Sequence, residues 1–346
     1  MEDNEKHHED YFRERGMAIL QRRSDGSLNT QDRRFCATFG VSWLVVTKLW
    51  LLLEQVEGEV EVRRQRKRKD LREYLLWALM FLKLYTTYND LSSRVQVDKK
   101  TYSKWVDKVV DMIALLENDK VSSFYFQILF VKKQLTHQLN LILSFILISF
   151  EKIKLSNRLK NDRGNDCLLS VDCVDFEINE PHSFTLPYSR IWYSPKFKGP
   201  GLRYEIALAI ISGDIAWVNG PFPCGKHNDW EIFNKKGLRY YLEKNERVKA
   251  DDGYHAGDPE VTKTPSGIFH PTARKKFRNR VRARQESVNK RFKQWGALGE
   301  GKRSFRHNLE KHQTIFWPFL LSLNLRLKMG NLFLMFQNIL MIKITN

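Results

Sequence analysis

The chain has 346 residues, 42% of them hydrophobic, so it can bury the core of one large domain or two ordinary ones and is not a disordered tail. Its 58 Lys and Arg residues outnumber its 40 Asp and Glu residues, which gives a net charge of +18. This excess predicts a polyanionic partner, either nucleic acid or an anionic membrane. The four Cys residues form no C-x-x-C pair, which argues against a disulfide framework or zinc finger and favours a reducing intracellular compartment.

Residues 1–34 are expected to form a polar N-terminal tail. No signal peptide is expected, because these residues lack an apolar core followed by a small-residue cleavage site. The longest nearly apolar run, residues 139–150, is shorter than the roughly 20 residues that a membrane-spanning helix needs. Nucleic acid is therefore the leading partner, and no membrane association is expected. A membrane-surface protein stays a rival, but the basic residues do not flank that apolar run.

Residues 35–120 are expected to be helical and to bind DNA. Apolar segments at 41–56 and 71–84 fit helices, residues 88–94 fit a short helix, and 99–116 fit a longer one after a turn. The last two have the outline of a helix-turn-helix, and a plain helical hairpin fits the pattern as well. The run RRQRKRK is also compatible with a nuclear-import signal or a solvated linker. The candidate DNA-binding side chains here are Arg63, Arg64, Arg66, Lys67, Arg68, Lys69, Lys99, Lys100 and Lys104.

Residues 121–160 are expected to be an apolar insertion or linker. The thirty residues from 121 to 150 contain no Asp, Glu, Gly or Pro. They fit a buried helix, and they also fit a non-native insertion such as translated non-coding sequence. A similar texture returns in residues 329–346, within an expected C-terminal tail at 326–346.

From residue 161 to 325 the pattern changes to alternating strands and helices, which predicts an α/β domain with a mixed sheet and flanking helices. Asn228 and Asp229 are expected to cap the first helix, and residues 212–214 to form a tight hairpin turn. The expected strands are 167–178, 204–211, 215–219 and 247–250, and the expected helices run from 228 to about 245 and from 271 to 296.

Three carboxylates are placed unusually for structural acids. Asp172 lies within an apolar strand, where an unpaired charge is costly, and Asp251 ends a short strand. Glu286 is the one acidic residue among the twenty from 274 to 293, and it falls opposite the apolar face of its helix. A metal nuclease needs such carboxylates to hold divalent cations. Structural interpretations are also open: Asp251 can simply form a turn, and Glu286 can form an (i, i+4) ion pair with Arg282 or Lys290.

The helix around Glu286 is strongly basic, with ten Lys and Arg residues among those twenty positions. A lone carboxylate therefore lies on a surface suited to phosphates. The candidate DNA-binding side chains on this helix are Lys275, Arg278, Arg282, Lys290 and Lys293.

The segments SVDCVDFEI, ADDGYHAGDPEVTKTP and RARQESVNKRFKQW together resemble the catalytic domain of PIF/Harbinger-type DDE transposases, also called DDE superfamily endonucleases. The resemblance covers about residues 165–318 and implies an RNase H-like fold. Asp172, Asp251 and Glu286 take the three acidic positions, and the 34 residues between the last two suit the family. Asp229, in HNDWEIF, matches an acid at the head of the family's middle helix and is interpreted as a cap. Asp252 and the tripeptide 173–175 depart from the family pattern, in which Gly-Thr-His usually follows the first acid.

The resemblance implies that two Mg²⁺ or Mn²⁺ ions, held by the three acids, cut and join DNA phosphodiester bonds at transposon ends. The implied partners are double-stranded DNA of the transposon ends and the target, a separate DNA-binding helper protein and a second copy of the chain. The implied location is the nucleus. The alternative is a catalytically inactive, transposase-derived DNA-binding protein.

Overall fold

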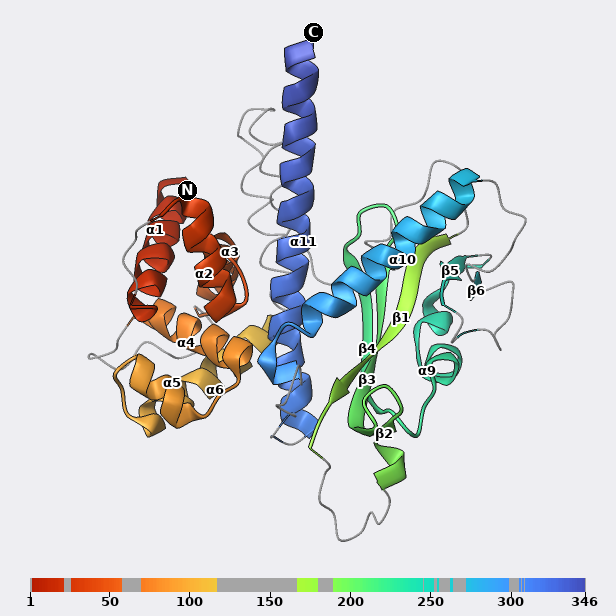
Figure 1. Cartoon of the computed structure of the whole chain (residues 1–346), viewed down its shortest axis with the longest axis horizontal. Helices are drawn as coiled ribbons and strands as arrows, with labels where there is room; N and C mark the ends of the chain where they lie inside the picture. Colours follow the sequence, from red (N-terminus) through yellow and green to blue (C-terminus); the bar gives the residue numbers. More distant parts are fainter. Residues whose placement is uncertain are drawn as a thin grey trace. The chain divides into compact units, whose positions relative to one another are not determined.

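The computed structural model describes residues 2–21, 26–57, 70–116, 167–179, 189–244, 246–251, 254, 262–263, 272–298, 305, 307 and 309–345 (Figure 1). The chain divides into two compact units. The helical unit comprises Met1–Lys152, Gln294–Ala297 and Leu309–Arg326, and the sheet unit comprises Ile153–Lys293, Leu298–Asn308 and Leu327–Asn346. The basic run at 63–69 and the apolar segment at 121–160 lie outside the described residues.

The helical unit begins with six helices: α1 (Glu2–Ile19), α2 (Leu28–Phe39), α3 (Trp43–Glu57), α4 (Leu71–Leu84), α5 (Tyr88–Arg94) and α6 (Lys99–Leu115). Side-chain caps mark the starts of three of them, since Asp70, Thr87 and Asp98 each accept a hydrogen bond from a backbone N–H in the first turn. The helices expected at 41–56, 71–84, 88–94 and 99–116 are confirmed, and each boundary lies within two residues of its expected position.

The core of the helical unit forms around α4, which is buried from Glu73 to Leu82. Apolar side chains of α6 are also buried, among them Val106 and Val109, and the Tyr102 hydroxyl donates a 3.0 Å hydrogen bond to the Trp77 carbonyl. No single described helix is long and apolar enough to cross a bilayer. Helix α2 and the first part of α3 together have the length and composition of a membrane span, but the chain bends by 56° between them.

Both predicted tails are wrong as tails. Residues 1–34 contain α1 and part of α2, because each helix has apolar residues to bury. Phe12 of α1 and Phe35 of α2 are both fully buried, and Gly16 of α1 leaves room for the Phe35 ring. Helix α11 (Leu309–Thr345) continues through residues 326–345, and its part from 309 to 326 belongs to the helical unit. The predicted nuclease domain therefore loses its last segment.

The sheet unit has a mixed sheet, which confirms the α/β class. Its strands are β1 (Cys167–Glu177), β2 (Tyr193–Ser194), β3 (Gly199–Ala209), β4 (Ile215–Pro223), β5 (Arg247–Lys249) and β6 (Thr262–Lys263). Its main helices are α9 (Asp229–Lys236) and α10 (Thr272–Phe292), and its short 3₁₀ turns include η2 (Ser189–Ile191) and η3 (Leu238–Tyr241). The strand order is β2-β3-β1-β5-β6, with β4 also paired to β3; β3 is antiparallel to β1, and β5 is parallel to it.

Local chemistry explains where the predicted boundaries hold and where they move. The expected turn at 212–214 is confirmed, with Gly213 at a φ of +77°. Asn228 caps α9 by accepting a 2.7 Å hydrogen bond from the Glu231 N–H, so Asp229 is not the cap. Helix α9 ends at Lys236 and not near residue 245, because Gly237 follows in an extended conformation, packed too closely against Glu205 to admit a Cβ.

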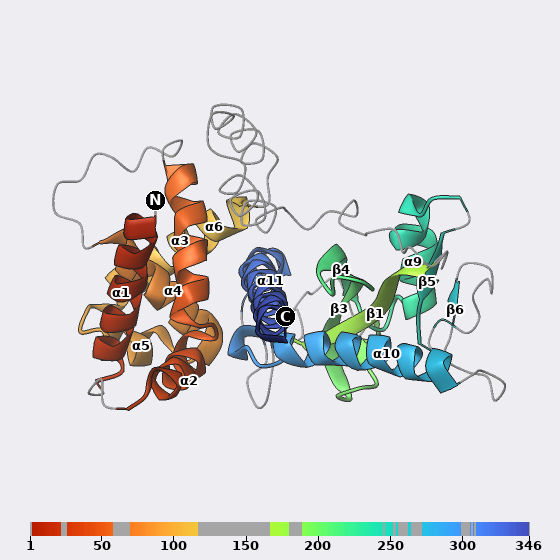
Figure 2. The same cartoon turned by 90° about the horizontal axis from the view of Figure 1, so that it is seen from above.

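The two faces of β1 meet different helices (Figure 2). Leu169 and Val171 belong to an apolar cluster with Phe233 of α9. Ser170 and Asp172, on the other face, bond to side chains of α10. Strand alternation thus aims Asp172 at the basic helix.

Candidate active site

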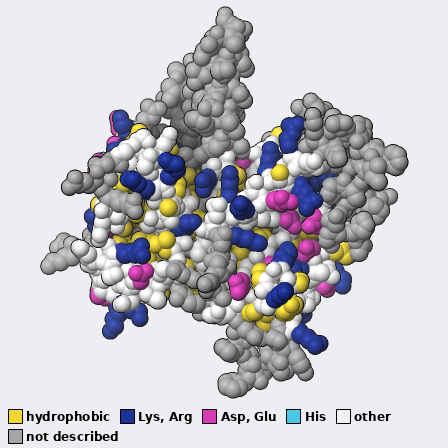
Figure 3. Space-filling model, in the orientation of Figure 1, with side chains coloured by type: hydrophobic (Ala, Val, Ile, Leu, Met, Phe, Trp, Pro, Cys, Tyr) yellow, Lys and Arg dark blue, Asp and Glu magenta, His cyan; other side chains and the backbone are white. Residues whose placement is uncertain are grey.

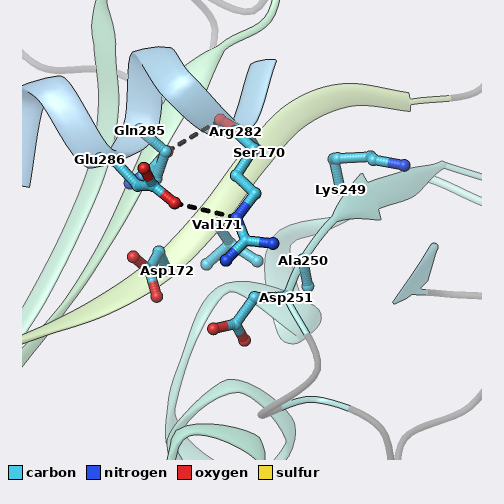
Figure 4. Close-up of a pocket in the computed structure, with 9 residues that line it drawn as sticks. All are labelled: Ser170, Val171, Asp172, Lys249, Ala250, Asp251, Arg282, Gln285 and Glu286. Carbon is cyan, nitrogen blue, oxygen red and sulfur yellow. Dashed lines mark hydrogen bonds and ion pairs between the residues drawn. The ribbon is translucent and has the colours of Figure 1, made fainter. Parts of the chain in front are cut away.

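Parallel pairing brings Asp172 and Asp251 together. In the ladder between β1 and β5, Ser170 is opposite Lys249. Two residues further along each chain are Asp172 and Asp251, and both side chains line one pocket (Figure 4). Neighbouring parallel strands therefore supply two carboxylates at the same level of the sheet.

Helix α10 supplies the third carboxylate, and two of its polar side chains fix how it lies on β1. Gln285 accepts a 2.8 Å hydrogen bond from the Ser170 hydroxyl and donates one of 3.3 Å to the Ile206 carbonyl. Asn289 Nδ2 donates a 2.6 Å hydrogen bond to Asp172 Oδ2. Because Glu286 follows Gln285, these contacts place it on the wall of the same pocket. The structure thus brings all three predicted acids to one pocket.

Glu286 is nevertheless paired with a cation. Arg282 Nε lies 2.9 Å from Glu286 Oε1, and both side chains are more than half exposed. The (i, i+4) ion pair that was the structural alternative for Glu286 is therefore present. Figure 4 shows the Arg282 guanidinium reaching into the pocket, toward the side of Asp251. Glu286 both lines the pocket and holds an arginine in it.

Burial shapes the electrostatics of Asp172. Loss of solvent raises the pKa of Asp172 to about 7, the negative charge of Asp251 adds to this rise, and Lys196 opposes it. Two hydrogen bonds partly compensate the carboxylate, one from Asn289 and one of 2.8 Å from the Cys173 N–H. A strand carboxylate with a strongly raised pKa, in a pocket beside a second carboxylate, is typical of a functional site.

The neighbouring acids on the other face of β1 are neutralised within the protein. Asp175, fully buried, receives hydrogen bonds from Arg203 Nε at 2.7 Å, from Arg203 Nη2 at 2.9 Å and from the Ser194 hydroxyl at 2.8 Å. Burial alone would raise the pKa of Asp175, but the bonds from Arg203 and Ser194, together with the positive charges of Lys196 and Arg203, lower it. Arg203 Nη1 also lies 2.8 Å from Asp229 Oδ1. Asp175 and Asp229 are thus partners of one arginine.

The donor chemistry of the pocket suits hard divalent cations, which prefer carboxylate oxygens. Repulsion between Asp172 and Asp251, seen in the raised pKa of Asp172, is what a cation between them would relieve. Across the residues that the structure describes, no three His, Cys, Asp or Glu side chains are close enough to hold one metal ion. Carboxylate oxygens are the donors that Mg²⁺ and Mn²⁺ prefer, but in the described structure Glu286 is paired with Arg282.

The predicted DNA-binding residues fall in three places. Arg282 and Lys290 are exposed on α10, and Lys293 is exposed just after its end. In the space-filling view, acidic side chains gather among Lys and Arg over the sheet unit (Figure 3). Lys275 and Arg278 belong to α10, but their side chains lie outside the description. Exposed cations also occur in the helical unit, at the start of α6: Lys99, Lys100 and Lys104. The run Arg63, Arg64, Arg66, Lys67, Arg68 and Lys69 lies outside the described residues.

Sequence reasoning missed the polar residues that hold this site together. Asn289 carried a usable signal, because it is three residues after Glu286 and so shares its side of the helix. Arg203 carried none, since its contact with Asp175 depends on the register of β1 and β3. Comparisons of the chain with models of protein families, with curated proteins and with solved structures found no match, so the family resemblance rests on the sequence segments that carry it.

Proposed function

We propose that the chain is a metal-dependent DNA endonuclease of the DDE transposase type, which cuts and joins phosphodiester bonds at transposon ends. The observation that carries this proposal is the convergence of Asp172, Asp251 and Glu286 on one pocket from three separate parts of the sequence. The mixed sheet with helices on both faces agrees with the RNase H-like architecture that the resemblance implies.

Each residue has a distinct task in this proposal. Asp172 and Asp251 would hold the cations from adjacent strands, and Asn289 keeps the Asp172 carboxylate turned toward the pocket. Glu286 would join them after leaving Arg282, which is then available to a DNA phosphate. When bound, Mg²⁺ or Mn²⁺ lowers the pKa of the attacking water or DNA 3′-hydroxyl and stabilises the leaving oxygen.

DNA binding belongs to the same proposal. The exposed cations of α10 are suited to backbone phosphates close to the pocket, which give affinity without sequence information. Sequence recognition falls to the α5–α6 pair, through Lys99, Lys100 and Lys104, or to a helper protein. Action on genomic DNA implies the nucleus, and a second copy of the chain is a candidate partner at paired transposon ends.

The alternative is a DNA-binding protein that has kept this fold without catalysis. The ion pair between Arg282 and Glu286 favours it, because it occupies the third carboxylate and leaves no assembled group of three ligands among the described residues. Both candidates predict DNA binding, and only the nuclease predicts metal-dependent cleavage.

Cleavage of a supercoiled plasmid carrying the genomic flanks of the coding sequence tests the proposal. With Mg²⁺ or Mn²⁺ the protein should nick or join this DNA, and Asp172→Ala, Asp251→Ala and Glu286→Ala should each abolish the reaction. Glu231→Ala is the matched control, because Glu231 also forms an (i, i+4) ion pair, with Lys235, but lies outside the pocket. DNA binding without cleavage by the wild type would favour the inactive alternative, and cleavage by all three variants would refute the site.

A further inference from the structure

Lys196 lies beside the carboxylate pocket, on the turn between β2 and β3. Its backbone N–H donates a 3.3 Å hydrogen bond to the Ser194 hydroxyl, which ties the turn to the end of β2. Its Nζ donates a 3.4 Å hydrogen bond to the carbonyl of Cys173, the residue that follows Asp172. The ammonium group is therefore held next to the central strand, within reach of the pocket's first acid.

An ion pair with Asp175 does not account for this lysine. Lys196 Nζ is 3.9 Å from Asp175 Oδ1, at the limit of an ion pair. Asp175 is already satisfied by two bonds from Arg203 and one from Ser194, all of 2.9 Å or less. A fourth, distant partner that is 48% exposed adds little stability, about 0–1 kcal/mol. Arg203 is thus the main partner of Asp175, and the charge of Lys196 adds to its effect from a greater distance.

The charge of Lys196 acts on Asp175 and also on the acids around the pocket. Burial raises the pKa of Asp172 and of Asp229, and Lys196 opposes both rises. An ammonium with this reach and half its surface in solvent can also attract an anion that enters from outside. The cations that line the pocket itself, Lys249 and Arg282, come from β5 and α10, and Lys196 adds a positive charge on the side of the Cys173 carbonyl.

We propose that Lys196 binds a backbone phosphate of the DNA strand that enters the pocket, and so positions that strand against Asp172. The proposal rests on the proposed function and adds a residue from a part of the chain, the β2–β3 turn, that the three acidic segments do not include. Lysine suits this task as a compact charge with three donors, one of which is used by the Cys173 carbonyl.

Equilibrium binding of a labelled random DNA duplex, measured in EDTA over a range of salt, tests Lys196 without relying on catalysis. Lys196→Ala should weaken binding about five- to tenfold at low salt and reduce the slope of log K against log salt by about 0.9, the loss of one phosphate contact. Lys196→Gln should behave like Lys196→Ala, because it can keep a hydrogen bond to Cys173 but has no charge. Lys196→Arg should restore most of the slope.

The control is Lys235→Ala, which removes another exposed lysine from an ion pair with an acid, 3.5 Å from Glu231. It should leave the slope unchanged. A wild-type slope in Lys196→Ala, or full recovery in Lys196→Gln, would overturn the role of Lys196 and leave the nuclease proposal intact. If the wild type binds DNA with the Lys196-dependent slope but never cleaves it, the nuclease proposal fails and Lys196 stands as a DNA-binding residue. If the wild type binds no DNA, both fail.

Discussion

A carboxylate within a buried strand costs free energy that hydrophobic residues at the same position would not. Asp172 has two hydrogen bonds, yet burial and the charge of Asp251 still raise its pKa to about 7. The fold therefore carries a charge that lowers its stability near neutral pH. Such a residue is expected where a bound cation, and not the folded chain alone, completes its environment.

The pH dependence of stability should report this strain. The folded-state pKa of Asp172 is raised above the ordinary value of 3.8, so the unfolded chain releases the proton first as pH increases. Stability should fall between about pH 4 and pH 7, and the cost should be complete above about pH 7, at about 4 kcal/mol. Asp172→Asn removes this cost. Urea unfolding of both proteins in EDTA should show the variant gaining on the wild type from about pH 4 to about pH 7; a difference independent of pH would contradict the raised pKa.

Arg282 competes with any cation for Glu286. Arg282→Ala should therefore lower the Mn²⁺ concentration that half-maximally raises the melting temperature, by about twofold, which corresponds to an exposed ion pair of 0.3–0.5 kcal/mol. Arg280→Ala removes an equally exposed arginine of α10 that does not line the pocket and should have a smaller effect. Equal shifts in both variants would mean that the loss of one positive charge, and not the loss of the ion pair with Glu286, changes the Mn²⁺ concentration required.

At the scale of elements, one arginine joins three of them. Arg203 of β3 bonds to Asp175 of β1, to the His227 carbonyl before α9 and to Asp229 at the first turn of α9. These bonds fix the end of the sheet near the β2–β3 turn and the start of α9. A buried network of this kind holds elements in register only while every charge in it is paired.

Arg203→Ala should destabilise the sheet unit by about 3–5 kcal/mol, because it leaves Asp175 buried without its main partner. Adding Asp175→Asn should recover part of the loss, since the uncompensated charge is then gone. Arg203→Lys should recover less than the double variant, because lysine cannot replace two parallel bonds. Urea unfolding of Arg203→Ala, Asp175→Asn and the double variant gives the coupling free energy between Arg203 and Asp175, and additive effects would exclude the network.

At the scale of the whole molecule, the charge of +18 predicts how DNA binding responds to salt. Affinity for a random duplex should fall about 10³-fold from about 50 to about 200 mM salt if about six phosphates are neutralised. A morpholino duplex of the same sequence, which has no backbone charge, should bind weakly at both salt concentrations. Fluorescence anisotropy measures both, and a flat salt response for DNA would show that the positive charge has another purpose.

The segments where local pattern and capping agree could be read from sequence alone. The helices at 71–84 and 88–94 are found at their predicted boundaries, because Asp70 and Thr87 cap apolar-periodic segments. The strand around Asp172 was equally clear from its β-branched and apolar residues. The helical N-terminus was missed because its overall polarity hides a single buried face, marked by Phe12.

For the candidate site, the sequence by itself singled out the three acids: Asp172 within an apolar strand, Asp251 at the end of a short strand and Glu286 in a basic helix. Tertiary structure alone decided that β1 and β5 pair with Asp172 beside Asp251, that α10 turns Glu286 to the same pocket, and that Arg282 holds it. It also decided that Asp175 and Asp229 are shared by Arg203 and that Lys196 lies beside Cys173. The physical reason is that these contacts depend on strand register and helix rotation, which are set by packing between segments up to 117 residues apart along the chain.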